Sequence, residues 1–173
     1  MNTTRDIENK MLQAVGEPLN SGIRPEMGAA AFTGVFGEFV ELTASETEAD
    51  KTALLAHYLA YLGSYIGRNV FAMADGREHY PNLFIGLVGE SSKGRKGTAR
   101  KRVDQLWKQA VPEFVEFNVM NGLHSGEGLI HSVRDAAVVD DDGIGDKGIQ
   151  DKRRLFVEEE LSGPFSRMSQ PHN

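Results

Sequence analysis

One abrupt change of composition constrains the fold of this chain more than any other feature. Residues 83–88 read Leu-Phe-Ile-Gly-Leu-Val and predict a buried strand, and residues 89–98 then supply glycines, hydroxyls and cations. The pattern at 98–110 predicts a helix. A strand, a glycine-rich loop and a helix start can together hold a polyphosphate, because small residues expose backbone N–H groups and the helix start adds a positive dipole. We predict a phosphate-binding loop here; the alternative is a basic turn without a ligand.

The spacing within the loop departs from the common Gly-x-x-x-x-Gly-Lys-Ser/Thr pattern. Counted from Gly89 and Gly94, the lysine position holds Arg95 and the hydroxyl position holds Lys96. The run from Lys96 to Thr98 offers the same chemistry, displaced by one or two residues. The expected phosphate-contacting residues are Gly89, Ser92, Lys93, Gly94, Arg95, Lys96, Gly97 and Thr98.

The charge of the chain is unevenly distributed. Net charge is −6 over 173 residues, yet six cations lie within 93–102 and four aspartates within 140–146. A local basic patch on an acidic protein suits one bound polyanion, although a charge run is also typical of a solvated helix face. There is no cysteine, so disulfides and thiolate metal sites are excluded. We find no signal peptide, and the most apolar segment, 54–66, is too short to span a bilayer, so we expect a cytoplasmic chain without a membrane partner.

The order of the predicted elements is typical of an α/β fold. A strand, a loop, a helix, a strand, a helix and a strand alternate with short connections, which predicts a parallel sheet flanked by helices. We therefore expect a helical N-terminal region at 1–78 and a partial nucleotide-binding core at 79–173. The expected elements are helices at 4–15, 32–40, 45–67, 98–110 and 125–134, a short strand at 71–73 before a turn at 75–76, and strands at 83–88, 114–120 and 154–157.

Acidic residues follow the last predicted strand. The carboxyl ends of parallel strands meet at one edge of a sheet, where ligands bind. Glu158 lies where a metal-associated acid is expected and Glu159 where a catalytic base is expected. Glu127, in the helix after the second strand, is an alternative base. The competing readings are a solvated acidic turn at 158–160 and a purely structural helix cap at Ser125.

Several motifs together resemble a group of P-loop ATPases found in bacteria, phages and mobile elements. These ATPases often accompany primase–polymerase domains and are helicase-like. The resemblance covers about residues 30–160, and the run from Arg95 to Thr98 is fairly specific to the group. The motifs are Gly34-x-x-Gly37-Glu38-x-Val40, Thr47-Glu48-Ala49-Asp50, Gly63-x-x-Ile66-Gly67, His79-x-x-Asn82-Leu83-Phe84, Ser92 to Thr98, Ser125-Gly126-Glu127-Gly128-Leu129 and Arg134-Asp135.

This resemblance implies a RecA-like core that uses ATP and Mg²⁺ on single-stranded or duplex DNA. Lys96 and Thr98 would contact phosphate and Mg²⁺, with Glu158 at the metal and Glu159 orienting water. A primase–polymerase domain and further copies of the chain are the implied partners. The acids depart from the group in reading Glu-Glu-Glu, and the chain ends soon after the third predicted strand. We therefore expect a truncated core that binds ATP and hydrolyses it very slowly or not at all. The rival hypothesis is a non-catalytic module that binds nucleic acid or a partner through the basic patch at 93–102.

Overall fold

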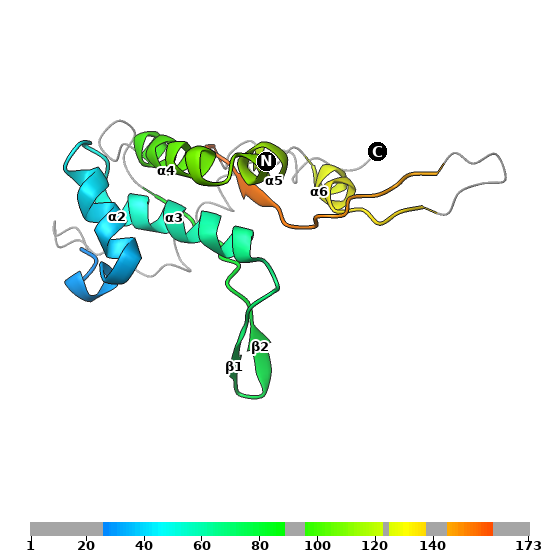
Figure 1. Cartoon of the computed structure of the whole chain (residues 1–173), viewed down its shortest axis with the longest axis horizontal. Coiled ribbons are helices and arrows are strands. Elements are labelled where there is room, and N and C mark those ends of the chain that lie inside the picture. Colours follow the sequence, from blue (N-terminus) through cyan, green and yellow to red (C-terminus); the bar gives the residue numbers. More distant parts are fainter. Residues whose placement is uncertain (1–25, 89–95, 123–124, 138–144, 161–173) are drawn as a thin grey trace, which may run out of the picture.

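The computed structural model describes residues 26–88, 96–122, 125–137 and 145–160, and shows packed helices beside a small parallel sheet (Figure 1). The expected helix at 4–15 lies outside these residues. The α/β class is confirmed at this level. The elements are a 3-10 helix (Ala29–Ala31), α2 (Gly34–Ala44), α3 (Lys51–Ile66), β1 (Ala72–Ala74), β2 (Arg77–His79), α4 (Lys96–Ala110), α5 (Pro112–Asn118), β3 (Val119–Asn121), α6 (Gly126–Ser132) and β4 (Leu155–Val157).

Helix α3 begins later than the sequence suggested. Its N-cap is Asp50, whose carboxylate accepts a hydrogen bond from the Ala53 N–H at 3.0 Å. The expected start at Ser45 is wrong, because Ser45 ends α2 and its hydroxyl donates to the Leu42 carbonyl at 2.7 Å. A short polar side chain can form a hydrogen bond to the backbone at either end of a helix. Its presence alone therefore does not show whether a helix begins or ends there. Gly67, with φ +61°, ends α3.

The hydrophobic core lies mainly between α3 and α4, which run side by side (Figure 1). Trp107 of α4 is 7% exposed, and its ring centroid lies 6.1, 5.8 and 5.5 Å from those of Tyr58, Tyr61 and Tyr65 of α3. Buried aromatic rings contribute both area and edge contacts, so this cluster is a main source of stability. Within the described residues, no helix is both long and apolar enough to cross a bilayer.

Strands β1 and β2 form a hairpin that projects from the body beyond the end of α3 (Figure 1). Their register pairs Ala72 with His79 and Ala74 with Arg77. The two turn residues, Asp75 and Gly76, have φ of 50° and 73°, as two-residue hairpin turns require. The predicted short strand and its turn are confirmed, and the returning strand β2 is an addition.

Strands β3 and β4 pair in parallel, with α6 in the connection between them. The register pairs Val119 with Leu155 and Asn121 with Val157, and the Gly122 N–H donates to the Val157 carbonyl at 2.9 Å. Both strands therefore end at one edge, which we call the carboxyl edge. The predictions of a parallel arrangement and of a strand near 154–157 are confirmed.

The expected buried strand at 83–88 is wrong. These residues form no strand, and the side chains of Phe84 and Val88 are 98% and 97% exposed. A strand needs a neighbour for its backbone N–H and C=O groups, and in the described part of the chain β3 and β4 pair only with each other. A short apolar run does not by itself supply that neighbour.

The expected strand at 114–120 is wrong over most of its length, because residues up to Asn118 belong to α5. Pro112 occupies the start of this helix, where its fixed φ and missing N–H are tolerated. Phe114, Val115 and Asn118 are buried together, which is the spacing of one helix face. Only the last part of the predicted strand belongs to β3.

Candidate functional site

Arg100 of α4 connects the early part of that helix to the carboxyl edge. Its Nη1 lies 2.7 Å from Glu159 Oε1, and its Nη2 donates to Asn121 Oδ1. Asn121 is the last residue of β3, and Glu159 lies two residues beyond β4. The Arg100 side chain is only 16% exposed, whereas that of Glu159 is 68% exposed. The Arg100 guanidinium is therefore held in place at the carboxyl edge, whereas the Glu159 carboxylate lies largely in solvent.

The first turn of α4 holds three of the predicted phosphate-contacting residues. Helix α4 begins at Lys96, and Gly97 and Thr98 follow within the turn. The first N–H groups of a helix lack partners within it and lie at the positive end of the dipole. Lys96 precedes Arg100 by four residues, so both lie on the same face of the helix. The other predicted loop residues lie outside the described part of the chain: Gly89, Ser92, Lys93, Gly94 and Arg95.

The acids after β4 have different surroundings. Glu158 is half-buried, and its Oε1 accepts from the Glu160 N–H at 3.3 Å. Glu159 reaches Arg100 instead. Among the described residues, no three acidic or histidine side chains form a ready-made metal site. Mg²⁺ prefers oxygen ligands and keeps several waters, so the Thr98 hydroxyl and the Glu158 carboxylate are each of a chemical type that it binds.

The helix after β3 begins as predicted. Ser125 is the N-cap of α6, and its hydroxyl accepts from the Gly128 N–H at 3.0 Å. Glu127 is exposed in the first turn. In the described residues, no hydrogen bond or ion pair connects Glu127 with Arg100 or Glu159. The structural cap at Ser125 is confirmed, and the role of Glu127 as a base stays a prediction.

Polar side chains also connect α3 with α4 one turn after Arg100. The Tyr61 hydroxyl donates to Asp104 Oδ1 at 3.1 Å, and Lys108 pairs with Asp104 at 2.7 Å. Burial, followed by the charge of Asp104, raises the pKa of Tyr61 to about 12. Burial also lowers the pKa of His57, and the charge of Arg100 lowers it further.

Sequence reasoning placed Arg100 only within the basic patch at 93–102, and it missed Asn121 and this supporting layer. A signal was present, because residues four apart lie on one helix face. His57 and Tyr61 have this spacing on α3, as do Arg100 and Asp104 on α4. The contact of Arg100 with residues at the two strand ends depends on the tertiary fold and has no local signature.

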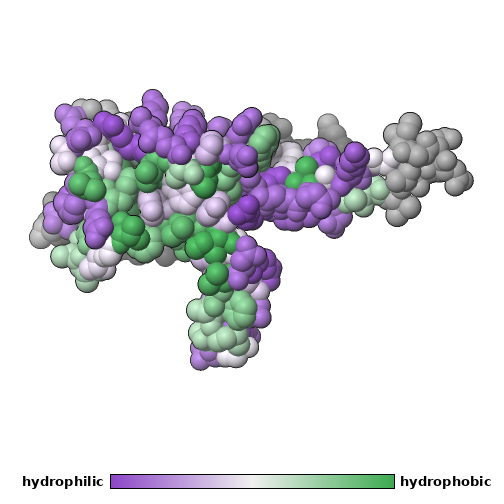
Figure 2. Space-filling model, viewed as in Figure 1, coloured by the Kyte–Doolittle hydropathy of each residue, from purple (hydrophilic) through white to green (hydrophobic). Residues whose placement is uncertain are grey.

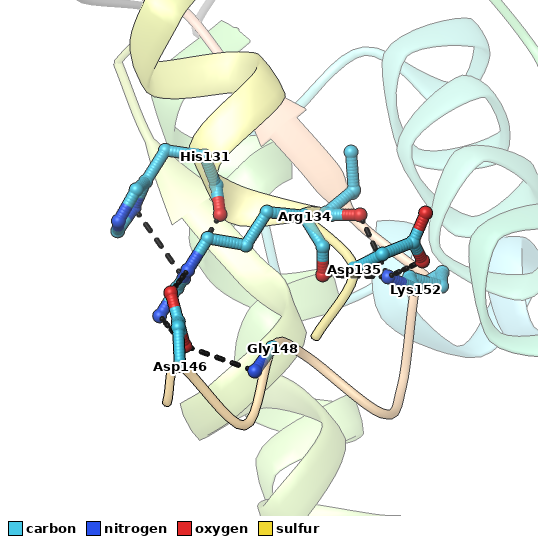
Figure 3. A network of polar contacts seen from close by, with 7 residues as sticks. His131, Arg134, Asp135, Asp146, Gly148 and Lys152 are labelled. Carbon is cyan, nitrogen blue, oxygen red and sulfur yellow. Dashed lines mark hydrogen bonds and ion pairs between the residues drawn. The ribbon is translucent and has the colours of Figure 1, made fainter. Parts of the chain in front are cut away.

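The Arg134-Asp135 pair belongs to a separate polar network at the end of α6 (Figure 3). Arg134 pairs with Asp146, while Lys152 Nζ lies 2.7 Å from Asp135 Oδ1 and 2.6 Å from the Arg134 carbonyl oxygen. Asp146 also accepts from the Gly148 N–H at 2.9 Å. The hydrogen bond from Arg134 is the largest cause of the lowered pKa of Asp146. These contacts tie the chain before β4 to the end of α6, which is a structural role.

An open groove of about 790 Å³ lies at the opposite end of α4, between α5 and the chain before β4. Its lining includes Tyr65, Phe114 and Arg153, and none of the predicted site residues. The Arg153 guanidinium is committed to Asp151, at 2.7 Å, and to the Tyr65 carbonyl oxygen, at 2.5 Å. The hydrogen bond from Arg153 lowers the pKa of Asp151 to about 2.

No protein-family model, curated protein or solved structure matches this chain. Function is therefore inferred from the chemistry of the carboxyl edge. At that edge Arg100 of α4 pairs with Glu159, which follows Glu158 after β4, and Lys96 lies one turn earlier, in the first turn of the helix. A helix start and cations attract a polyanion, while oxygen ligands and carboxylates suit a divalent cation and a water molecule.

Proposed function

We propose that this chain is the nucleotide-binding portion of a DNA-associated P-loop ATPase, helicase-like or primase–helicase-like, and that ATP and Mg²⁺ bind at the carboxyl edge. The observation on which this depends is the double contact of Arg100 with Asn121 and Glu159. Through it, α4 at Arg100, one turn after Lys96, lies beside an acid that follows β4. Phosphate-binding and metal-associated groups must be neighbours in such a site, and they are distant in the sequence.

Each edge residue has a role in this proposal. The N–H groups of the first turn of α4 and the ammonium of Lys96 bind the β- and γ-phosphates. Thr98 and Glu158 hold the metal, Glu159 orients the attacking water, and Glu127 is the second candidate for that role. Bound Mg²⁺ neutralises the charge that develops on the phosphate oxygens.

A calorimetric titration with ATP and Mg²⁺ tests the proposal. We expect Lys96→Ala to weaken binding at least about tenfold, which corresponds to the roughly 1.4 kcal/mol or more of a charge-assisted contact. Lys101→Ala is the matched control, since it removes an exposed cation from the same helix. Removal of Mg²⁺ should also weaken ATP binding. Failure of the wild type to bind ATP, or an equal loss in both variants, would contradict the proposal.

A second candidate function is nucleic-acid binding without catalysis. The outer surface of α4 is hydrophilic (Figure 2), and its exposed cations include Lys101 and Lys108, the latter paired with Asp104. Cations that contact backbone phosphates give an affinity that falls steeply with salt. DNA titrations at several salt concentrations distinguish the two functions, because this second one is indifferent to ATP and is weakened by Lys101→Ala. DNA, a primase–polymerase domain and a second copy of the chain are proposed partners in either case.

A further inference from the structure

The contacts of Arg100 are unequal. Its Asn121 partner is the last residue of β3, so that contact is fixed by the sheet. Its Glu159 partner lies beyond the strand end and is 68% exposed, so that side chain can turn into solvent without unfolding any element. The ion pair can therefore open by movement of the carboxylate alone.

We propose that Arg100 holds Glu159 in the nucleotide-free protein and exchanges it for the terminal phosphate when ATP binds, which releases the Glu159 carboxylate to orient water. Arg100 is then a positioning residue for Glu159. This inference rests on the proposed ATP site, and it adds a means of keeping the water-orienting group occupied until nucleotide arrives.

The energies favour such an exchange. The Glu159 carboxylate is largely in solvent, and ion pairs that are open to solvent contribute only about 0–1 kcal/mol, so release of Glu159 costs little. A guanidinium matches the paired oxygens of a phosphate, and phosphate carries more charge than a carboxylate. Arg100 lies one helical turn after Lys96, on the face directed at the carboxyl edge. After the exchange, Asn121 still accepts a hydrogen bond from the guanidinium, so its orientation is kept.

The exchange predicts that removing the Glu159 charge strengthens nucleotide binding. In the wild type the ligand must displace the Arg100–Glu159 pair, whereas in Glu159→Gln the guanidinium is already available. We expect a non-hydrolysable ATP analogue with Mg²⁺ to bind Glu159→Gln about two- to fivefold more tightly than the wild type. This ratio corresponds to the free energy that a solvent-open ion pair contributes. Glu160→Gln removes the same charge from the neighbouring exposed residue and should give no comparable gain.

The decisive experiment is a calorimetric double-mutant cycle on the full 173-residue chain with the same analogue and Mg²⁺. In an Arg100→Gln background, Glu159→Gln should give no gain in affinity, because no pair remains to be displaced. General repulsion between the acid and the anionic ligand would give the gain in both backgrounds, and that result would overturn the exchange. An equal gain from Glu160→Gln would overturn it too, and this comparison needs no Arg100 variant, so the test survives if Arg100→Gln misfolds.

These outcomes separate the exchange from the proposed function. Tight binding by the wild type without the predicted difference between variants overturns the exchange and leaves the ATP site in place. Absence of binding by the wild type overturns both. Arg100→Lys adds a further readout, because a lysine keeps the charge and loses the paired donors. The gain from Glu159→Gln should then fall below that in the wild type, whereas a purely structural role for Arg100 predicts no change in this gain.

Discussion

The hydrogen bond between Tyr61 and Asp104 joins α3 to α4 directly behind Arg100, and its removal has a calculable cost. Tyr61 is fully buried, and its hydroxyl donates to the carboxylate at 3.1 Å. A hydrogen bond to a charged group contributes roughly 1.5–3 kcal/mol. In Tyr61→Phe, Asp104 keeps Lys108 at 2.7 Å, so we expect the lower end of that range, about 1.5 kcal/mol.

The same hydrogen bond should make stability depend on alkaline pH. The pKa of Tyr61 is about 12 in the folded protein, against 10.0 as its ordinary value. The protonated phenol is favoured by folding, so its contribution is complete below pH 10 and is lost as pH rises from 10 towards 12. At pH 11 the unfolded chain has gained about 1.4 kcal/mol from ionisation, which cancels most of the advantage over Tyr61→Phe.

Urea unfolding of both proteins at pH 7 and pH 11 tests this reasoning. Trp107 is the only tryptophan of the chain and is buried against Tyr61, so its fluorescence reports loss of this packing. Comparison with the Phe variant cancels the titration of the other tyrosines. Equal stabilities at pH 7, or a difference that stays the same at pH 11, would refute the assigned hydrogen bond.

Two further predictions concern other parts of the fold. Gly148 has φ +63°, and an added Cβ would lie 2.4 Å from the Ala136 backbone nitrogen. The neighbouring Ile149 N–H donates to the Arg134 carbonyl at 3.0 Å, so Gly148→Ala should speed amide exchange at Ile149 more than about tenfold. Gly76→Ala, which has open space around it, should leave that amide unchanged. The lowered pKa of His57 means that stability is lost as pH falls below 6.5, and His57→Gln should remove this slope in acid unfolding experiments.

Helices with a clear apolar face were largely predictable from the sequence. The helix expected at 98–110 is α4, whose Val103 and Trp107 are buried in the core, and Ser125 caps α6 as its position suggested. These features depend on neighbours within one or two turns. The start of α3 was misplaced because the sequence offers several capping residues before it, and only tertiary context selects Asp50.

Strands were less predictable, since they exist only where another strand supplies hydrogen bonds. Residues 83–88 have the composition of a buried strand and form none, whereas the shorter β4 forms because β3 lies beside it. At the candidate site, Glu159 was predicted from its position after a strand. Its partner Arg100 was not, because the two are 59 residues apart and meet only in the folded chain.

The most direct test of the nucleotide site is residue-resolved amide NMR of the chain during titration with a non-hydrolysable ATP analogue and Mg²⁺. We predict that the largest shifts occur at 96–100, at Asn121 and Gly122, and at 157–160, around the contact of Arg100 with the two strand ends. Shifts centred instead on the groove around Tyr65 and Arg153, or no shifts at saturating analogue, would contradict the assignment of the carboxyl edge as the ATP site.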